Sequence, residues 1–458
     1  MVNLRLRDIA HWTGGTLRGA DRDVNAVSTD TRTLGTGALF VALRGERYDA
    51  HDFLATARER GAAAFLVDHV IDSDLPQIVV ADTLVAFGEI ARAVRAQRAV
   101  RVVGITGSNG KTTVKTLLAA ILARHGRTHV NPGNLNNEIG LPATLLAMPD
   151  DSEYAVLEMG AGKPGDIAYL ARIAQPQVAL VNNVAAAHLE RLGSVQGVAQ
   201  TKGEIYRALP ADGVAVINAD DAFAADFAVL AAPRRTLTFG LLQRADVGAR
   251  IDTQTQDTSR FQISTPIGAS DIALPLPGRH NVMNALAAAT LALALDVPLA
   301  RIRAGLESAA GVAGRLARRV HASGASVIDD SYNANPGSFA AAIAVLAAEP
   351  GERVLVMGDM GELGADAERL HADIGALAKR SGIRRLYAVG RLSRAAVAAF
   401  GHGAEHYPDQ ATLLAALHDE LRKGVVLLVK GSRLSAMDRV TQALLNTADA
   451  EGGARDAA

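Results

Sequence analysis

The segment at residues 102–126 constrains the fold of this chain more than any other. Its first residues, 102–106, are mostly β-branched and predict a buried strand, whereas the residues from position 114 onward carry apolar side chains at helical spacing. The loop between them contains Gly107, Ser108, Asn109, Gly110, Lys111, Thr112 and Thr113. A strand, a glycine-containing loop and a helix in this order predict a site for nucleotide phosphates, because the loop N–H groups and the positive end of the helix dipole face the anion.

Two side chains of this loop carry the chemistry that a triphosphate needs. We expect the Lys111 ammonium to reach the β- and γ-phosphates, and the Thr112 hydroxyl to hold Mg²⁺. The spacing departs from the strict phosphate-loop pattern, since position 105 is Ile and the nearest upstream glycine is Gly104. A glycine-rich turn without a ligand is the alternative, but the flanking strand and helix favour ATP.

Composition excludes several classes of protein. A chain of 458 residues exceeds a single hydrophobic core, so about two to four domains are expected. The absence of cysteine excludes disulfides, thiolate zinc sites and thiol catalysis, and a formal net charge of −1 predicts no binding to nucleic acid. The charged first residues and the short apolar runs predict a cytoplasmic protein without a signal peptide or a membrane insertion.

The pattern of strands and helices predicts an α/β protein with three domains. Residues 1–97 mix short strands and helices, which is typical of a small mixed α/β domain. Residues 98–314 alternate strands with helices and predict a central P-loop-type ATPase domain with a parallel sheet, interrupted by an antiparallel stretch at 234–276. Residues 315–458 repeat the alternation as a separate Rossmann-like domain. The predicted strands span residues 38–43, 63–67, 77–80, 100–106, 154–158, 178–182, 214–218, 326–329, 353–357, 385–389 and 425–430.

Polar side chains follow the predicted strands of the central domain, where ligands bind in open parallel sheets. The Glu158 carboxylate would complete a magnesium shell begun by Thr112, with a helix cap or a solvated acid as the alternative. His188 follows the next strand, but a lone histidine is more often a satisfied polar contact than a ligand. Lys202 lies on an otherwise ordinary helix, and the pattern alone predicts a surface lysine.

Further polar residues lie near the predicted junction of the second and third domains. Asn281 opens an alanine-rich helix, where an amide would contact adenine or simply cap the helix. Arg315 would reach phosphate as domains close, or would form a linker salt bridge. The loop at 329–336, which includes Asp330, is dense in acids and amides, and we favour a ribose or metal role over an Asx turn.

Taken in order, these blocks resemble the Mur ligase family of ATP-dependent amide-forming enzymes in peptidoglycan assembly. The resemblance covers nearly the whole chain, and DSYNANP is its most specific element. Within the family, the chain is most similar to members that join D-alanyl-D-alanine to UDP-N-acetylmuramoyl tripeptide, and it lacks the DNPR motif of the tripeptide-forming members. The blocks are TGSNGKTTVK (106–115), NPGNLNNEIGLP (131–142), LEMGAG (157–162), NNVAAAHLE (182–190), TKGEIY (201–206), PGRHNVMNALAA (277–288), DDSYNANPGS (329–338), GDMGELG (358–364), VKGSR (429–433) and a first-domain block at 28–53.

The resemblance implies roles for the central residues. The loop 107–113 would hold the ATP phosphates, with Lys111 on the transferred group, and Arg315 would also contact phosphate. Thr112 and Glu158 would bind one Mg²⁺, while His188 and Lys202 would bind a second. In this family the lysine that matches Lys202 is carbamylated by CO₂, which turns it into an anionic oxygen ligand suited to Mg²⁺.

The resemblance also implies how the substrates bind. Asn281 and Asp330 would contact adenosine. The remaining substrate contacts would be Ser28, Thr31 and Arg32 for the UDP group, with the 45–53 loop nearby, Asn134 and Asn137 for the nucleotide sugar, and Lys430, Ser432 and Arg433 for D-alanyl-D-alanine.

The implied reaction phosphorylates the free carboxylate of the tripeptide to an acyl phosphate, which the amine of D-alanyl-D-alanine then attacks. The partners are therefore small molecules, and we expect a monomer. Two alternatives stay open. Another Mur-type or folate polyglutamylating ligase would share the phosphate loop, and a P-loop kinase or regulatory ATPase would hydrolyse or transfer phosphate without forming an amide.

Overall fold

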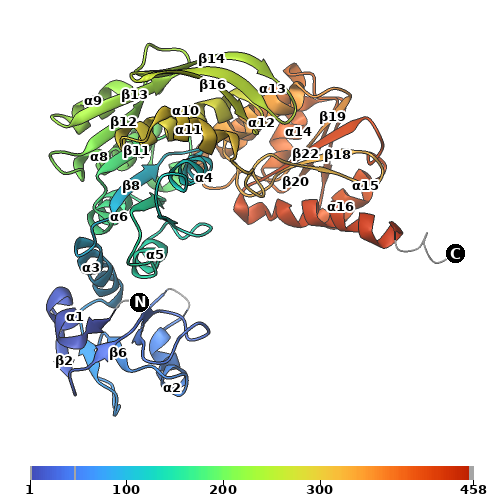
Figure 1. The fold of residues 1–458 in the computed structure, drawn as a ribbon. Coiled ribbons are helices and arrows are strands. Elements are labelled where there is room, and N and C mark those ends of the chain that lie inside the picture. The colour runs from blue at the N-terminus through green and yellow to red at the C-terminus, as the bar shows by residue number, and fades with distance from the viewer. Residues whose placement is uncertain (1–2, 46–47, 453–458) are drawn as a thin grey trace.

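The computed structural model describes residues 3–45 and 48–452, with side chains to residue 446. Over these residues the chain forms a small N-terminal unit, a large central sheet and a C-terminal sheet, each flanked by helices (Figure 1). Parallel strands alternate with helices in all of them, so the prediction of an α/β protein is confirmed. The domain boundaries given above stay a prediction. No helix in the described ranges is both long and apolar enough to cross a membrane.

The N-terminal unit contains a five-stranded sheet in which only β2 runs antiparallel to its neighbour. Its strands are, in spatial order, β2 (Thr16–Arg18), β7 (Gln77–Val79), β6 (Ala64–Val67), β5 (Leu39–Val41) and β4 (Val27–Ser28). Its other elements are β1 (Leu4–Arg5), which pairs with β3 (Asp23–Val24), and α1 (Leu6–Thr13), η1 (Ala50–Phe53), α2 (Leu54–Glu59) and α3 (Thr83–Ala96).

The central sheet has nine strands, and it begins as a parallel sheet built around the predicted phosphate loop. Its strands are, in spatial order, β9 (Thr128–Val130), β10 (Tyr154–Glu158), β8 (Arg101–Thr106), β11 (Val178–Val181), β12 (Val214–Asn218), β13 (Arg235–Gly240), β14 (Val247–Gln254), β15 (Ser259–Thr265) and β16 (Gly268–Leu274). The helices of this part are α4 (Lys111–Leu122), α5 (Gly140–Leu146), α6 (Asp166–Ala174), α7 (Leu189–Leu192), α8 (Val195–Arg207), α9 (Ala224–Ala231), α10 (Arg279–Ala294) and α11 (Leu299–Glu307).

The antiparallel stretch predicted at 234–276 is smaller than expected. Strand β13 runs parallel to β12, and β14 runs parallel to β13, so antiparallel pairing is confined to β14, β15 and β16. The reason is that α9 crosses over between β12 and β13 and returns the chain in the same direction. The prediction of an antiparallel excursion from residue 234 was therefore wrong for β13.

The C-terminal sheet has six strands, all parallel apart from β17, which pairs antiparallel with β18. Its strands are, in spatial order, β17 (Ala317–Val320), β18 (Ser326–Asp330), β22 (Val425–Lys430), β19 (Glu352–Met357), β20 (Arg385–Val389) and β21 (Ala404–Tyr407). Its helices are α12 (Pro336–Ala347), η2 (Gly364–Asp366), α13 (Ala367–Arg380), α14 (Ser393–Phe400), α15 (Gln410–His418), η3 (Arg433–Ser435) and α16 (Met437–Gly452).

Apolar cores cover both faces of the two larger sheets. On one face of the central sheet, α4, α10 and α11 bury Leu118, Ile121 and Leu286. On its other face, a core that includes Ile167 and Ile205 continues through α3 and α5 into the N-terminal unit. The central and N-terminal parts therefore share one continuous core, which fixes how they are joined.

The strand order explains why the predicted site residues meet. Strand β8 lies between β10 and β11, and all three are parallel. Their carboxyl ends therefore lie side by side, which brings the loop after Thr106 next to Glu158 and Asn182. This edge is the usual place for a ligand in an open parallel sheet.

Helices α4 and α11 approach each other closely at Gly305, which leads to a stability prediction. A Cβ atom at Gly305 would lie 2.4 Å from Ile121 Cα, a backbone atom that cannot turn away. Alanine normally favours a helix over glycine by about 1 kcal/mol, but overpacking a core costs about 1–3 kcal/mol. Gly305→Ala is therefore expected to lower the melting temperature by several degrees. The control Gly35→Ala, at an exposed position with open space around it, should leave the melting temperature unchanged; equal melting temperatures for both variants would refute the close approach.

Candidate active site

The phosphate loop is held in shape by the chain that follows β11. The Ser108 N–H donates to the Asn183 carbonyl at 2.9 Å, and the Asn109 N–H donates to Asn183 Oδ1 at 2.8 Å. Gly110 has φ of 79° and a Cβ there would lie 2.4 Å from Asn284 Oδ1, so both its conformation and its surroundings require glycine. Helix α4 begins directly afterwards at Lys111, so the N–H groups of its first turn face the loop.

Glu158 and Thr112 lie together, as predicted. The Thr112 hydroxyl donates to Glu158 Oε2 at 2.9 Å, and Asn136 Nδ2 donates to Glu158 Oε1 at 2.7 Å. Burial opposes ionisation of Glu158, but the neighbouring ammonium groups of Lys111 and Lys115 outweigh it, so its pKa lies below the ordinary value. Glu158 is thus an ionised, almost fully buried carboxylate at the carboxyl end of β10.

Two lysines of helix α4 lie near this carboxylate. The Lys111 ammonium donates to the Gly107 carbonyl at 2.8 Å, and burial lowers its pKa. Lys115 Nζ lies 3.5 Å from Glu158 Oε2 and donates to the carbonyls of Asn131 and Gly133. Lys115 was not singled out from the sequence, although a lysine among the apolar residues of α4 indicates a buried charge.

Lys202 is buried, so the prediction of a surface lysine from its helix pattern was wrong. It is 1% exposed on helix α8, which packs against β8 and β11. Burial, and then the nearby Lys111 charge, hold its pKa well below the ordinary value. No hydrogen bond or ion pair joins its amine to any part of the chain that the structure describes. Its surroundings therefore favour the neutral amine over the ammonium.

His188 faces a carboxylate from the C-terminal sheet. His188 Nδ1 lies 2.5 Å from Glu362 Oε2, and the Glu190 N–H donates to the Glu362 carbonyl at 3.3 Å. The hydrogen bond from His188 lowers the pKa of Glu362. Glu362 belongs to the GDMGELG block, but nothing local in the sequence pairs it with His188, because the contact depends on how the two sheets are placed.

The C-terminal part also reaches the phosphate loop directly. Arg315 Nη2 donates to Thr112 Oγ1 at 3.4 Å, and its guanidinium lies 4.3 Å from the centre of the Tyr332 ring. Asn335 caps helix α12 by accepting from the Ser338 N–H at 2.9 Å, and its amide donates to Asn109 Oδ1 at 2.8 Å. The expected alternative of a linker salt bridge does not apply to Arg315, since the structure pairs it with Thr112 and Tyr332.

Two neighbouring cavities open at this junction. The larger, of about 830 Å³, is lined by Asn281 and Asp330 together with apolar residues such as Leu241 and Val345. The smaller, of about 480 Å³, is lined by the phosphate loop, Glu158 and His188. Asn109, Gly110, Arg315 and Ser338 line both cavities, which therefore form one continuous site.

The three residues expected at the D-alanyl-D-alanine end are separated. Lys430 lines the larger cavity, where its ammonium lies 2.6 Å from Asp330 Oδ2, and burial lowers its pKa. Arg433 lines the smaller cavity, and Ser432 is buried and bonded to Ser435. Asn134 and Asn137 line the smaller cavity.

The residues expected to hold the UDP group lie in the N-terminal unit and line neither cavity. Arg32 is engaged in an ion pair with Asp30 at 2.7 Å, and the Ser28 hydroxyl donates to the Asp30 carbonyl at 3.1 Å. The Arg60 guanidinium donates to the Thr31 carbonyl at 2.9 Å. Within the expected 45–53 loop, positions 46–47 lie outside the described residues.

His280 gives this site a predicted sensitivity to acid. Burial beside the larger cavity lowers its pKa from 6.5 to about 4. Between these values the unfolded chain binds a proton that the folded chain does not, so stability should fall as the pH drops from 6.5 towards 4. The free energy of unfolding, obtained from melting curves across this range, should depend less steeply on pH in His280→Asn than in the wild type, by the slope that one bound proton contributes. Identical slopes for both proteins would refute the lowered pKa.

Comparison with protein families places the whole site in one family. Residues 23–118 match the family described as "Mur ligase family, catalytic domain", residues 105–292 match "Mur ligase middle domain", and residues 314–433 match "Mur ligase, glutamate ligase domain".

Individual relatives are similar to this chain over nearly its full length. The UDP-N-acetylmuramoyl-tripeptide–D-alanyl-D-alanine ligase of Escherichia coli K12 is 46% identical, over 97% of this chain and 99% of its own. A crystal structure of MurF from Acinetobacter baumannii is 36% identical with a TM-score of 0.93, over 97% of this chain and 99% of that one. MurF ligase from Thermotoga maritima in complex with ADP is 28% identical with a TM-score of 0.84, over 93% and 99%. The chain belongs to the Mur ligase family.

Proposed function

We propose that this chain is an ATP-dependent ligase that joins D-alanyl-D-alanine to UDP-N-acetylmuramoyl tripeptide, giving the pentapeptide precursor of peptidoglycan together with ADP and phosphate. The relatives at 46% and 36% identity that carry this name support the assignment. The observation that carries it is the meeting of Thr112, Glu158 and Lys111 at the carboxyl end of the central sheet, in a cavity continuous with a second one.

ATP would span the two cavities. Its adenosine would lie in the larger one, whose apolar walls suit a base and whose Asn281 and Asp330 side chains suit polar ring and ribose atoms. Its phosphates would lie on the loop 107–113, at the start of helix α4, with Lys111 and Arg315 beside them. The ADP complex of the Thermotoga maritima relative supports a nucleotide site in this fold.

The residues around Thr112 fit a magnesium ion. An ionised carboxylate and a hydroxyl 2.9 Å apart are hard oxygen ligands of the kind that Mg²⁺ prefers. When bound, the ion would neutralise charge on the phosphates and on the transferred phosphoryl group. His188, 2.5 Å from Glu362, would contribute to a second such site.

Lys202 fits a carbamate. Its amine is buried and without a partner in the described chain, and burial holds its pKa well below the ordinary value, which favours the neutral form that attacks CO₂. The nitrogen would attack CO₂ and lose a proton, which converts it into an anionic oxygen ligand. The neighbouring Lys111 charge, which disfavours an ammonium at this position, would stabilise that anion.

The reaction would proceed in two steps, phosphoryl transfer and then amide formation. A carboxylate oxygen of the tripeptide attacks the γ-phosphorus, and the bond to the bridging oxygen of ADP breaks, which leaves an acyl phosphate. The amine of D-alanyl-D-alanine then attacks the acyl carbon, loses a proton and expels phosphate. Lys111, Arg315 and the start of helix α4 would stabilise the charge that gathers on phosphate oxygens in both steps.

The substrates would enter from different parts of the molecule. The UDP group would bind Ser28, Thr31 and Arg32 of the N-terminal unit, and the peptide would extend past Asn134 and Asn137 into the smaller cavity. Arg433, which lines that cavity, would contact D-alanyl-D-alanine, with Ser432 and Lys430 behind it. Since the reaction uses ATP and a nucleotide-linked sugar, we place it in the cytoplasm.

The test is phosphate release from ATP with the acceptors supplied separately and together. The proposal requires release that depends on both UDP-N-acetylmuramoyl tripeptide and D-alanyl-D-alanine, with a product heavier by the dipeptide. Release without either acceptor would favour the regulatory ATPase, and phosphate transfer to a single acceptor would favour the kinase. Activity with folate and glutamate would favour the polyglutamylating ligase.

A further inference from the structure

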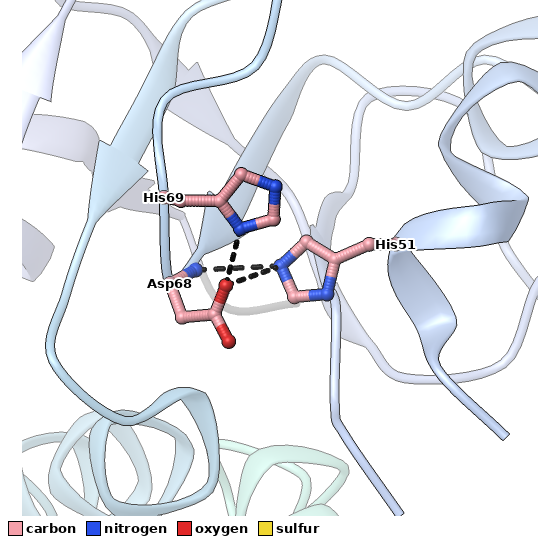
Figure 2. A group of neighbouring side chains, drawn as sticks. All are labelled: His51, Asp68 and His69. Carbon is pink, nitrogen blue, oxygen red and sulfur yellow. Dashed lines mark hydrogen bonds and ion pairs between the residues drawn. The ribbon is translucent and has the colours of Figure 1, made fainter.

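A second cluster of possible metal ligands lies in the N-terminal unit, away from both cavities. His51 belongs to η1, whereas Asp68 and His69 follow β6 directly. Figure 2 shows both imidazole rings turned towards the Asp68 carboxylate. His69 Nδ1 lies 2.5 Å and His51 Nε2 lies 3.3 Å from Asp68 Oδ1, and one ligand atom of each residue lies within 4.8 Å of the others.

Hydrogen bonds fix which nitrogen of His51 is free to bind. Asp49 Oδ1 lies 2.6 Å from His51 Nδ1 and accepts a hydrogen bond from its N–H group. The backbone N–H of Asp68 donates to His51 Nε2 at 3.3 Å, so that nitrogen carries a lone pair. The same lone pair faces the Asp68 carboxylate oxygen at 3.3 Å, and a cation between them would remove the repulsion between these two electron-rich atoms. A carboxylate that orients a histidine in this way is the usual outer partner of a metal-bound imidazole.

The charge and exposure of the cluster suit a divalent ion. Arg44 Nη2 lies 3.2 Å from Asp49 Oδ2 and 3.1 Å from Asp68 Oδ2. It also donates to Asp68 Oδ1 at 3.4 Å, so it approaches Oδ2 more closely than the oxygen that faces the two imidazoles. Two carboxylates against one guanidinium leave a net negative charge. The His51 side chain is 7% exposed and the His69 side chain 56% exposed, so one side of the cluster is protein and the other is open to water.

We propose that His51 Nε2, Asp68 Oδ1 and His69 Nδ1 bind a divalent transition-metal ion of the zinc class, with water in the remaining position. Two imidazoles and one carboxylate favour Zn²⁺, Co²⁺ or Ni²⁺ over Mg²⁺, which prefers oxygen alone. Binding requires the His69 tautomer that carries its proton on Nε2, so that Nδ1 offers a lone pair in place of its hydrogen bond to Asp68, and it replaces the Asp68 N–H bond to His51. The ion would tie η1 to the end of β6.

The experiment is calorimetric titration of the full chain with ZnCl₂ in excess MgCl₂, which competes with zinc for the oxygen ligands of the proposed ATP site. We expect one zinc equivalent, and a loss of affinity of about tenfold or more for His69→Asn and for Asp49→Asn. His69 is largely exposed, so its variant should fold, and the exposed His11→Asn serves as the control.

Cobalt provides an independent readout. Co²⁺ added to the wild-type chain should produce visible absorption bands, and these bands should be lost in His51→Asn and kept in His11→Asn. The proposal is overturned if the wild type takes up no zinc beyond that of His69→Asn, or if the cobalt bands are the same in all variants. Either failure leaves the proposed ligase activity untouched, because the readout is metal binding alone.

Discussion

Replacing Lys111 with alanine is expected to lower the rate of ligation about a thousandfold or more. Its ammonium lies at the start of helix α4, between the phosphate loop and Glu158, so it is placed to stabilise the transferred phosphoryl group. Alanine keeps the helix and removes the charge. Phosphate release that depends on D-alanyl-D-alanine, measured on the purified variant, gives the result.

The matched control is Lys423→Ala, which removes an exposed lysine far along the chain and should leave the rate unchanged. Because burial lowers the pKa of Lys111, its loss should cost little stability, and the melting temperatures of both variants should agree within a few degrees. A Lys111→Ala protein that folds and ligates at a near-normal rate would contradict the assigned role.

Replacing Lys202 with alanine should also abolish ligation, but this loss should be partly repaired by short carboxylic acids such as acetate. The added carboxylate would occupy the space of the truncated side chain and supply the oxygen ligand that the carbamate provides. The measurement is the ligation rate across a series of acetate and propionate concentrations. Lys111→Ala, treated in the same way, should show no rescue.

Measurements of stability distinguish a catalytic role of Lys202 from a structural one. The folded pKa of Lys202 lies well below 10.5, so between that pKa and 10.5 the unfolded chain binds a proton that the folded chain does not. The lysine therefore costs stability at pH 7, and this cost fades as the pH rises towards 10.5. Lys202→Met should melt no lower than the wild type in CO₂-free buffer at pH 7, while being inactive. Full activity of Lys202→Ala without any added acid would remove the carbamate from the account.

Much of the fold could be predicted because local patterns determine it. Runs of β-branched residues such as those in β8 and β22 form buried strands wherever they occur, and their alternation with helices leaves few arrangements besides parallel sheets. The short strands β17 and β21 were missed, because their half-exposed residues carry charges and lack a continuous apolar run. Their place at the two edges of the sheet decides their structure.

The site could be predicted in part. The proximity of Thr112 and Glu158 could be predicted because Thr112 lies at the start of helix α4 and Glu158 at the end of β10, at the same edge of one sheet. The burial of Lys202 could not be predicted, because helix α8 becomes buried only when it packs against β11, α6 and α9. The Glu362 contact to His188 and the cluster of His51 with His69 depend on distant segments meeting, which no local pattern records.

In the proposed reaction, the γ-phosphoryl group of ATP is transferred to the tripeptide carboxylate, so one carboxylate oxygen leaves with the phosphate. This transfer is tested most directly by labelling the oxygens of that carboxylate with ¹⁸O and analysing the released phosphate by mass spectrometry. We expect one labelled oxygen in each phosphate released during ligation. Unlabelled phosphate, formed while the pentapeptide product accumulates, would contradict it.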